Sequence, residues 1–175
     1  MIRHVLLPTR RFFSSYSIGD TLNLDADVRR LVDESVLCWL ATSSELGQPS
    51  VSPKEVFTVF DNDSIIIANI ASPNSARNVR ENPMVCVSFV NVFTQRGYQI
   101  KGAAQYLRNG DDGFPEIEQV LLGITQGEYP FKAAFRVMAE EVSEILAPRY
   151  RLYPETTEQE QVDSAMISYG VRSRD

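Results

Sequence analysis

Short runs of strand-forming residues, separated by turn signals, most restrict what this chain can fold into. Such runs occur at residues 36–41, 50–60, 64–70, 84–93, 98–107 and 133–146. They are rich in β-branched and aromatic residues, and turn-forming segments such as Asp61-Asn62-Asp63 divide them. The pattern predicts six strands, mostly in consecutive antiparallel order, as a small barrel. Gly102 lies inside the fifth run, where the lack of a side chain predicts a bulge or a close backbone approach.

Helices are expected at the edges of this mainly β fold. Their ranges are residues 26–34, 76–81, 115–124 and 157–169. Asp25 or Asp27 can cap the first helix, and Thr156 or Thr157 can cap the last, which Gly170 can close. Residues 150–154, which follow Pro148, are expected to be extended.

Length and charge indicate one domain and exclude several functions. The 175 residues are 43% apolar, which suits a single core over residues 19–175, with residues 1–18 as a flexible N-terminal arm. Seventeen basic against 23 acidic residues give a net charge of −6, so neither nucleic acid nor a membrane is an expected partner. Cys38 and Cys86 form no paired motif, which favours a cytoplasmic location. The only histidine, His4, predicts no metal site.

Polar side chains gather where the strand before residue 70 passes into the second helix. A helix N-terminus offers free N–H groups and a positive dipole end, so this segment can hold a phosphate. The side chains that can complete such a cradle are Ser72, Asn74, Ser75 and Arg77. In the alternative interpretation, Ser72 and Asn74 only cap the helix and Arg77 is solvated.

Two further polar groups interrupt apolar strands. One is Ser52-Pro53-Lys54-Glu55, in which Pro53 marks an edge or a bulge. The other is Gln99 with Lys101, which alternate with Tyr98 and Ile100. Lys54, Gln99 and Lys101 can contact an electron-rich ring or a phosphate, or they can face solvent on a half-exposed sheet.

The order of several short motifs along the chain resembles that of the pyridoxamine 5′-phosphate oxidase-like family of FMN-binding split barrels. The strongest match is Arg77-Asn78-Val79-Arg80-Glu81-Asn82-Pro83, and Gly97-Tyr98-Gln99-Ile100-Lys101-Gly102 follows it at the expected place. The resemblance implies a six-stranded antiparallel split β-barrel. It also implies a homodimer that holds FMN in clefts along the subunit interface.

The resemblance also implies a set of cofactor contacts. The FMN phosphate would lie by Ser72, Asn74, Ser75 and Arg77, and the isoalloxazine ring would be bordered by Ser52, Pro53, Lys54 and Glu55. Main-chain groups beneath the cofactor would come from Ala68, Asn69 and Ile70. Gln99 and Lys101 would approach from the neighbouring strand of the same or the second subunit.

This sequence departs from that of the vitamin B6 oxidases of the family in its phosphate-binding residues and in its C-terminus. Asn74-Ser75 stands where the vitamin B6 oxidases have an Arg-Lys pair, and Ser52 stands where they have an arginine. The C-terminus has no counterpart of the segment that grips the vitamer phosphate, so pyridoxamine phosphate oxidation is not expected. The prediction is therefore an FMN-dependent oxidoreductase acting on an unknown small molecule. The alternative is a non-catalytic flavin-binding or stress-related protein; a haem-degrading barrel would need an axial histidine that His4 is poorly placed to supply.

Overall fold

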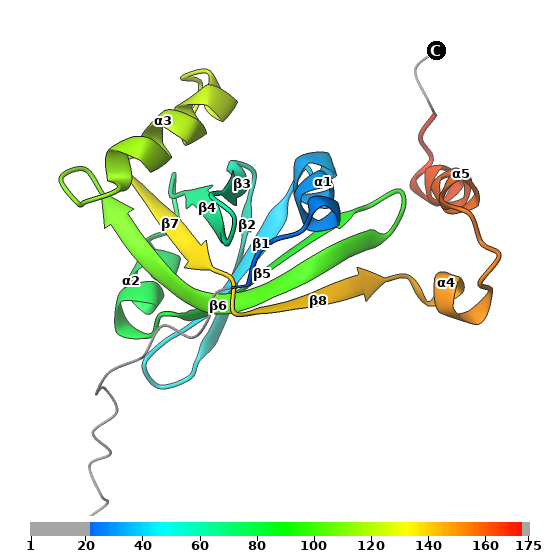
Figure 1. Ribbon diagram of the computed structural model, residues 1–175, viewed down its shortest axis with the longest axis horizontal. Helices are drawn as coiled ribbons and strands as arrows, with labels where there is room; N and C mark the ends of the chain where they lie inside the picture. Colours follow the sequence, from blue (N-terminus) through cyan, green and yellow to red (C-terminus); the bar gives the residue numbers. More distant parts are fainter. Residues whose placement is uncertain (1–21, 173–175) are drawn as a thin grey trace, which may run out of the picture.

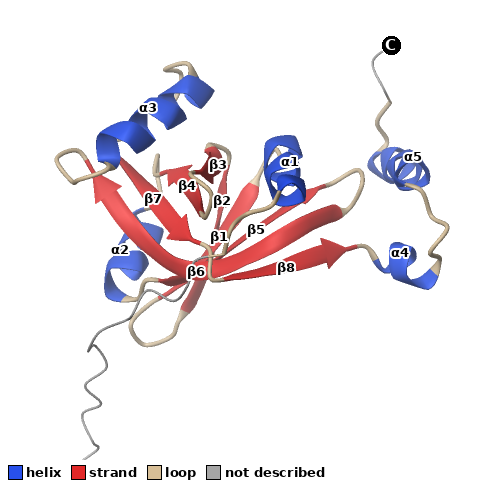
Figure 2. Cartoon of the chain, viewed as in Figure 1, coloured by secondary structure: helices blue, strands red, loops and turns tan. Residues whose placement is uncertain are grey.

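The computed structural model describes residues 22–172, so the expected N-terminal arm over residues 1–18 and His4 lie outside the described residues. The described chain folds into eight strands and five helices (Figures 1 and 2). Their bounds are α1 (Ala26–Glu34), β1 (Cys38–Ser43), β2 (Pro49–Lys54), β3 (Phe57–Phe60), β4 (Ser64–Ala68), α2 (Pro73–Glu81), β5 (Met84–Asn91), β6 (Arg96–Arg108), α3 (Phe114–Thr125), β7 (Ala133–Met138), β8 (Glu141–Leu146), α4 (Pro148–Leu152) and α5 (Glu158–Tyr169).

One long strand, β6, joins the two halves of the sheet. The strand order is β2-β1-β5-β6-β7-β4-β3, every pairing is antiparallel, and β8 pairs with the first half of β6. The thirteen residues of β6 therefore pair with β8 at one end and with β7 at the other, and the strand curves between them (Figure 1). This confirms the antiparallel split-barrel class predicted from the sequence.

The count of six strands was wrong, because two of the predicted strands are each divided in two. Residues 50–60 form β2 and β3, which lie at opposite ends of the strand order. The chain turns at Glu55 and Val56 and crosses from one half of the barrel to the other, where Val56 accepts a hydrogen bond from the N–H of Ala68 at 2.9 Å. Residues 133–146 form β7 and β8, which pair with different parts of β6.

Gly102 lies where the chain crosses between the half-sheets a second time, and the sequence predicted a bulge or a close backbone approach at this residue. The N–H of Glu140 donates to the carbonyl oxygen of Lys101 at 2.9 Å, where the chain leaves β7 for β8. A Cβ atom at Gly102 would lie 1.8 Å from the carbonyl oxygen of Met138. The close backbone approach is therefore confirmed, and only glycine allows it.

The predictions of α1, α3 and α5 were correct to within one residue at each end, α2 begins three residues before the predicted residue 76, and the prediction for residues 150–154 was wrong. Asp25 caps α1 by accepting from the N–H of Val28, and Thr157 with Glu160 forms a capping box on α5. Residues 148–152 form the short helix α4 instead of an extended segment. Pro148 is compatible with this helix because a first-turn residue needs no N–H donor.

Two apolar clusters hold the barrel together. The larger one joins α1 and α2 to the inner face of both half-sheets, with Leu40, Val87, Ile100 and Val137 fully buried. The smaller one packs Phe114, Ile117 and Leu121 of α3 against Ile66 and Ala134. No helix within residues 22–172 combines the length and apolar character needed to cross a membrane.

Candidate functional site

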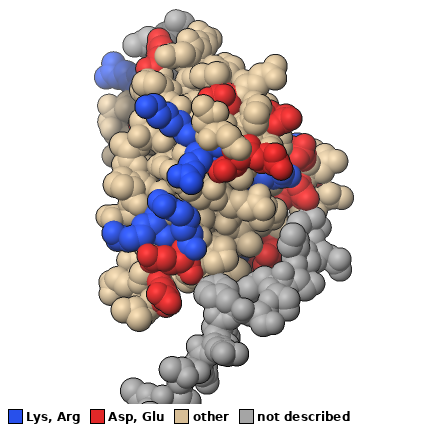
Figure 3. Space-filling view, turned by 90° about the vertical axis from the view of Figure 1, so that its left-hand side faces the viewer, with Lys and Arg blue, Asp and Glu red and all other residues tan. Residues whose placement is uncertain are grey.

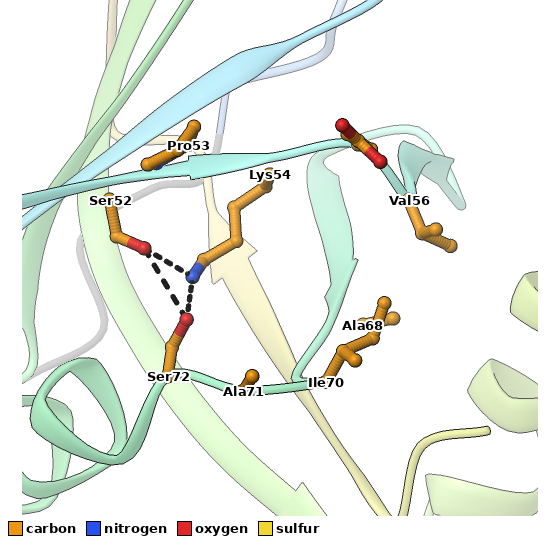
Figure 4. A pocket seen from close by; sticks show the side chains of 9 residues that line it. Ser52, Pro53, Lys54, Val56, Ala68, Ile70, Ala71 and Ser72 are labelled. Carbon is orange, nitrogen blue, oxygen red and sulfur yellow. Dashed lines mark hydrogen bonds between the residues drawn. The ribbon is translucent and has the colours of Figure 1, made fainter. Parts of the chain in front are cut away.

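A pocket of about 320 Å³ opens where the end of β2 meets the turn from β4 into α2 (Figure 4). Ser52, Lys54 and Ser72 form a hydrogen-bonded wall on one side, and Val56, Ala68 and Ile70 form an apolar wall on the other (Figure 4). The lining residues are Ser52, Pro53, Lys54, Glu55, Val56, Ala68, Ile70, Ala71 and Ser72. Because β2 and β4 are not neighbours in the sheet, the pocket exists only through the barrel closure.

The Lys54 ammonium is the centre of the polar wall. Lys54 is 6% exposed, and its Nζ donates to the Oγ of Ser52 at 2.8 Å and to the Oγ of Ser72. The ring centroid of Phe135 lies 6.0 Å from Nζ. Among the described residues no carboxylate forms an ion pair with Lys54. A buried cation held only by hydroxyl groups favours the binding of an anion.

Burial also lowers the pKa of the Lys54 ammonium from its ordinary value, while the thiol of Cys38, its register partner on β1, acts in the opposite direction. Burial raises the pKa of that thiol to about 12.

This shift predicts a pH dependence of stability. Because the pKa of Lys54 is lower in the folded protein, the unfolded chain binds this proton more tightly. The free energy of unfolding should therefore rise as the pH increases from the lowered folded pKa toward the ordinary value of 10.5. Urea denaturation at several pH values should show this rise in the unmodified protein relative to Lys54→Met. A difference between the two proteins that does not change with pH would contradict the shift.

Ser72 precedes α2 but does not cap it with its side chain. Its hydroxyl turns toward Lys54 and lies 3.3 Å from the Oγ of Ser52, and α2 has no side-chain cap (Figure 4). The N–H of Ser72 donates to Asn69 Oδ1 at 3.1 Å, which fixes the turn. Asn74 accepts from Arg77 at 3.2 Å instead of capping. The interpretation in which Ser72 and Asn74 only cap the helix is therefore wrong for both side chains.

The pocket brings together most of the residues predicted from the sequence. Those that line it are Ser52, Pro53, Lys54, Glu55, Ala68, Ile70 and Ser72, and the side chain of Asn69 accepts a hydrogen bond from the N–H of Ser72. Ser75 is buried in the first turn of α2, while Asn74 and Arg77 are exposed there and do not line the pocket. Sequence reasoning missed Val56 and Ala71. Each is next in the sequence to a residue that was predicted to line the site, and this adjacency could have led to its prediction.

Gln99 and Lys101 do not line this pocket of their own chain. Gln99 on β6 pairs with Ser88 on β5, and Ser88 pairs in turn with Trp39 on β1. Lys101 on β6 pairs with Cys86 on β5. All of them lie on the sheet face opposite the core residues Leu40, Val87 and Ile100, because side chains alternate along each strand. Lys101 Nζ forms an exposed ion pair with Glu141 at 2.7 Å.

We call this sheet surface the outer face and define it by Trp39, Ala41, Val51, Cys86, Gln99 and Lys101. Its apolar side chains are accessible: Trp39 is 46% exposed and Val51 is 60% exposed. Pro53 belongs to the same row as Trp39 and also lines the pocket, so the outer face borders the pocket. An accessible apolar surface of this kind is typical of a contact site.

The barrel matches a known family over its whole length. The sequence profile described as pyridoxamine 5′-phosphate oxidase matches residues 24–146, from just before α1 to the end of β8. The chain belongs to the pyridoxamine 5′-phosphate oxidase family. The helices α4 and α5 lie beyond the matched region. No curated protein matches the chain.

Solved structures share the fold of this pyridoxamine 5′-phosphate oxidase family member. HupZ of Group A Streptococcus superimposes with a TM-score of 0.61 at 19% identity, covering 71% of this chain and 95% of HupZ. A putative pyridoxamine 5′-phosphate oxidase of Lactobacillus delbrueckii has a TM-score of 0.57 at 21% identity, covering 71% and 97% of the two chains. An FMN-binding protein of Syntrophomonas wolfei has a TM-score of 0.56 at 16% identity, covering 67% and 82%.

Proposed function

We propose that this family member binds FMN in the pocket, as a homodimer, and acts as an oxidoreductase on a small molecule. The observation that carries the proposal is the buried Lys54 ammonium beside the start of α2, which has no acidic partner among residues 22–172. Bound FMN would supply the transfer of hydride or electrons, and the chain would supply binding, orientation and exclusion of water.

The pocket residues fit a flat heterocycle with an anionic tail. Val56, Ala68, Ile70 and Ala71 offer an apolar surface for a ring, whereas Lys54 and the two serine hydroxyls offer donors. The pocket volume of about 320 Å³ lies at the lower end of the roughly 300–1,000 Å³ of small-molecule sites. A single chain therefore provides a small site, and a second subunit would enlarge it.

The outer face is the proposed dimer contact. It presents the exposed apolar side chains of Trp39 and Val51 and is continuous with the pocket through Pro53. If two copies join through this face, Gln99 and Lys101 are directed at the partner subunit, which supports their predicted approach to the cofactor from the second subunit. The net charge of −6 argues against nucleic acid or an anionic membrane as a partner. The two free cysteines agree with the proposed cytoplasmic location.

Absorbance spectroscopy and flavin titration test the proposal. The purified protein is expected to be yellow or, after removal of flavin, to bind added FMN at micromolar concentration. A colourless protein that binds neither FMN nor a deazaflavin at that concentration would overturn the proposal.

Turnover decides between the oxidoreductase and the alternative, a non-catalytic flavin-binding protein. The alternative is favoured by the pocket itself: among its described lining residues, Lys54 and Glu55 are the titratable side chains, and they form no ion pair with each other. A saturable rate of NAD(P)H oxidation in the presence of FMN would support the oxidoreductase. Binding of FMN without such a rate, across several electron donors and acceptors, would support the binding protein.

A further inference from the structure

We propose that Lys54, held by Ser52 and Ser72, recognises the terminal phosphate of the cofactor and thereby makes the site selective for FMN over riboflavin. This inference rests on the proposed flavin binding. It changes the role expected from the sequence, in which Lys54 borders the isoalloxazine ring and Arg77 supplies the charge for the phosphate.

The distribution of charge around the pocket supports this assignment. Lys54 is the only basic residue among the lining residues, and the only acidic one, Glu55, is exposed. The guanidinium of Arg77 donates to Asn74 on the exposed side of α2. The face of the molecule that carries α2 shows a group of Lys and Arg side chains (Figure 3), and Arg77 and Arg80 are exposed on this helix. This surface can attract an anion, but Lys54 is the cation that lies inside the pocket.

The hydrogen bond from Lys54 to Ser72 places the ammonium beside the start of α2. Pro73 occupies the first helical position, and within residues 22–172 no side chain caps the N–H groups that follow it. A free helix N-terminus and a buried ammonium both favour a negative charge at the same point. The apolar wall formed by Val56, Ala68 and Ile70 is suited to the ring and not to a phosphate.

The position of Lys54 also compensates for the two departures from the vitamin B6 oxidases. Ser52 replaces their arginine on β2, and Lys54 lies two residues further along the same face of this strand. The hydroxyls of Ser52 and Ser72 hold the ammonium but do not neutralise it. A phosphate dianion would neutralise it and could accept hydrogen bonds from the same two hydroxyls.

The test compares FMN with riboflavin, which differ only in the phosphate. Flavin fluorescence titrations of the flavin-free protein should show FMN binding at least about tenfold tighter than riboflavin, and Lys54→Met should weaken FMN binding about 10- to 100-fold. Riboflavin binding should change less than about threefold, so that the preference for FMN largely disappears. Lys132→Met, which removes the same charge from an exposed position outside the pocket, should keep the preference.

Three other results of these titrations would overturn the inference. Equal weakening of FMN and riboflavin by Lys54→Met would place Lys54 at the ring or the ribityl chain and overturn the inference, while flavin binding would stand. Loss of the preference in Arg77→Gln but not in Lys54→Met would assign the phosphate to Arg77 and also overturn it. If the unmodified protein binds neither flavin, the proposed function fails and the inference fails with it.

A second measurement does not depend on any variant. Inorganic phosphate at millimolar concentration should compete with FMN for the unmodified protein and leave riboflavin binding unchanged. Competition with both flavins, or with neither, would contradict a phosphate site at Lys54.

Discussion

Gly102→Ala is expected to lower the free energy of unfolding by at least about 3 kcal/mol. The added Cβ atom would lie 1.8 Å from the carbonyl oxygen of Met138 and 3.2 Å from the backbone nitrogen of Glu140. Both neighbours are backbone atoms, so neither can rotate away as a side chain can. β6 would have to separate from the crossing between β7 and β8, which strains the hydrogen bond from Glu140 to Lys101.

Urea denaturation measures this effect, and Gly123→Ala is the matched control. Gly123 lies in α3, and a Cβ atom there has no neighbour within 4 Å. Alanine is a better helix former than glycine, so this control should raise the free energy of unfolding by about 0.5–1 kcal/mol. If Gly102→Ala lowered the free energy of unfolding by less than about 1 kcal/mol, the backbone at Gly102 could not lie as close to Met138 as described.

Trp39→Glu is expected to convert the proposed dimer into a monomer and to weaken FMN binding by at least about 30-fold. Trp39 is a large side chain on β1, between β2 and β5. It pairs across the sheet with Pro53 on β2, which lines the pocket. In a dimer joined through this face, a glutamate at this position would place a charge where the large apolar side chain of Trp39 was buried, and removing that charge from water is costly. The loss of the partner would also remove Gln99 and Lys101 of the second subunit from the cofactor.

Sedimentation and FMN titration on the same samples measure the two effects together. Leu122→Glu is the control, because Leu122 on α3 is 44% exposed, close to the 46% of Trp39, but lies on the other half of the barrel. The control should remain dimeric and bind FMN as the unmodified protein does. A Trp39→Glu protein that stays dimeric would show that the subunits join elsewhere, and a monomer that still binds FMN fully would show that one chain completes the site.

Local features of this fold were predictable because neighbouring residues decide them. The capping box of Thr157 and Glu160 and the closure of α5 by Gly170 involve residues only a few positions apart. The family motif of residues 77–83 likewise lies on one helix and the turn that follows. The turn into α2 was identified as the polar centre of the site, and Ser72 does line the pocket.

Non-local features were not predictable in the same way. Residues 50–60 have the composition of one strand, and only their different partners, β1 for Lys54 and β4 for Phe57, divide them into β2 and β3. The hydrogen bond between Lys54 and Ser72 joins residues 18 positions apart, on segments that are not neighbours in the sheet. No periodicity in the sequence indicates such a contact.

The sequence by itself determined the antiparallel β class, the caps of α1 and α5 and the family, because strand composition, capping and motif order are properties of adjacent residues. The tertiary structure alone decided that a lysine on β2 lies at the head of α2. The physical reason is that the chain crosses between the two half-sheets at Val56, and this crossing brings the end of β2 and the turn into α2, which are distant in the sequence, into one pocket.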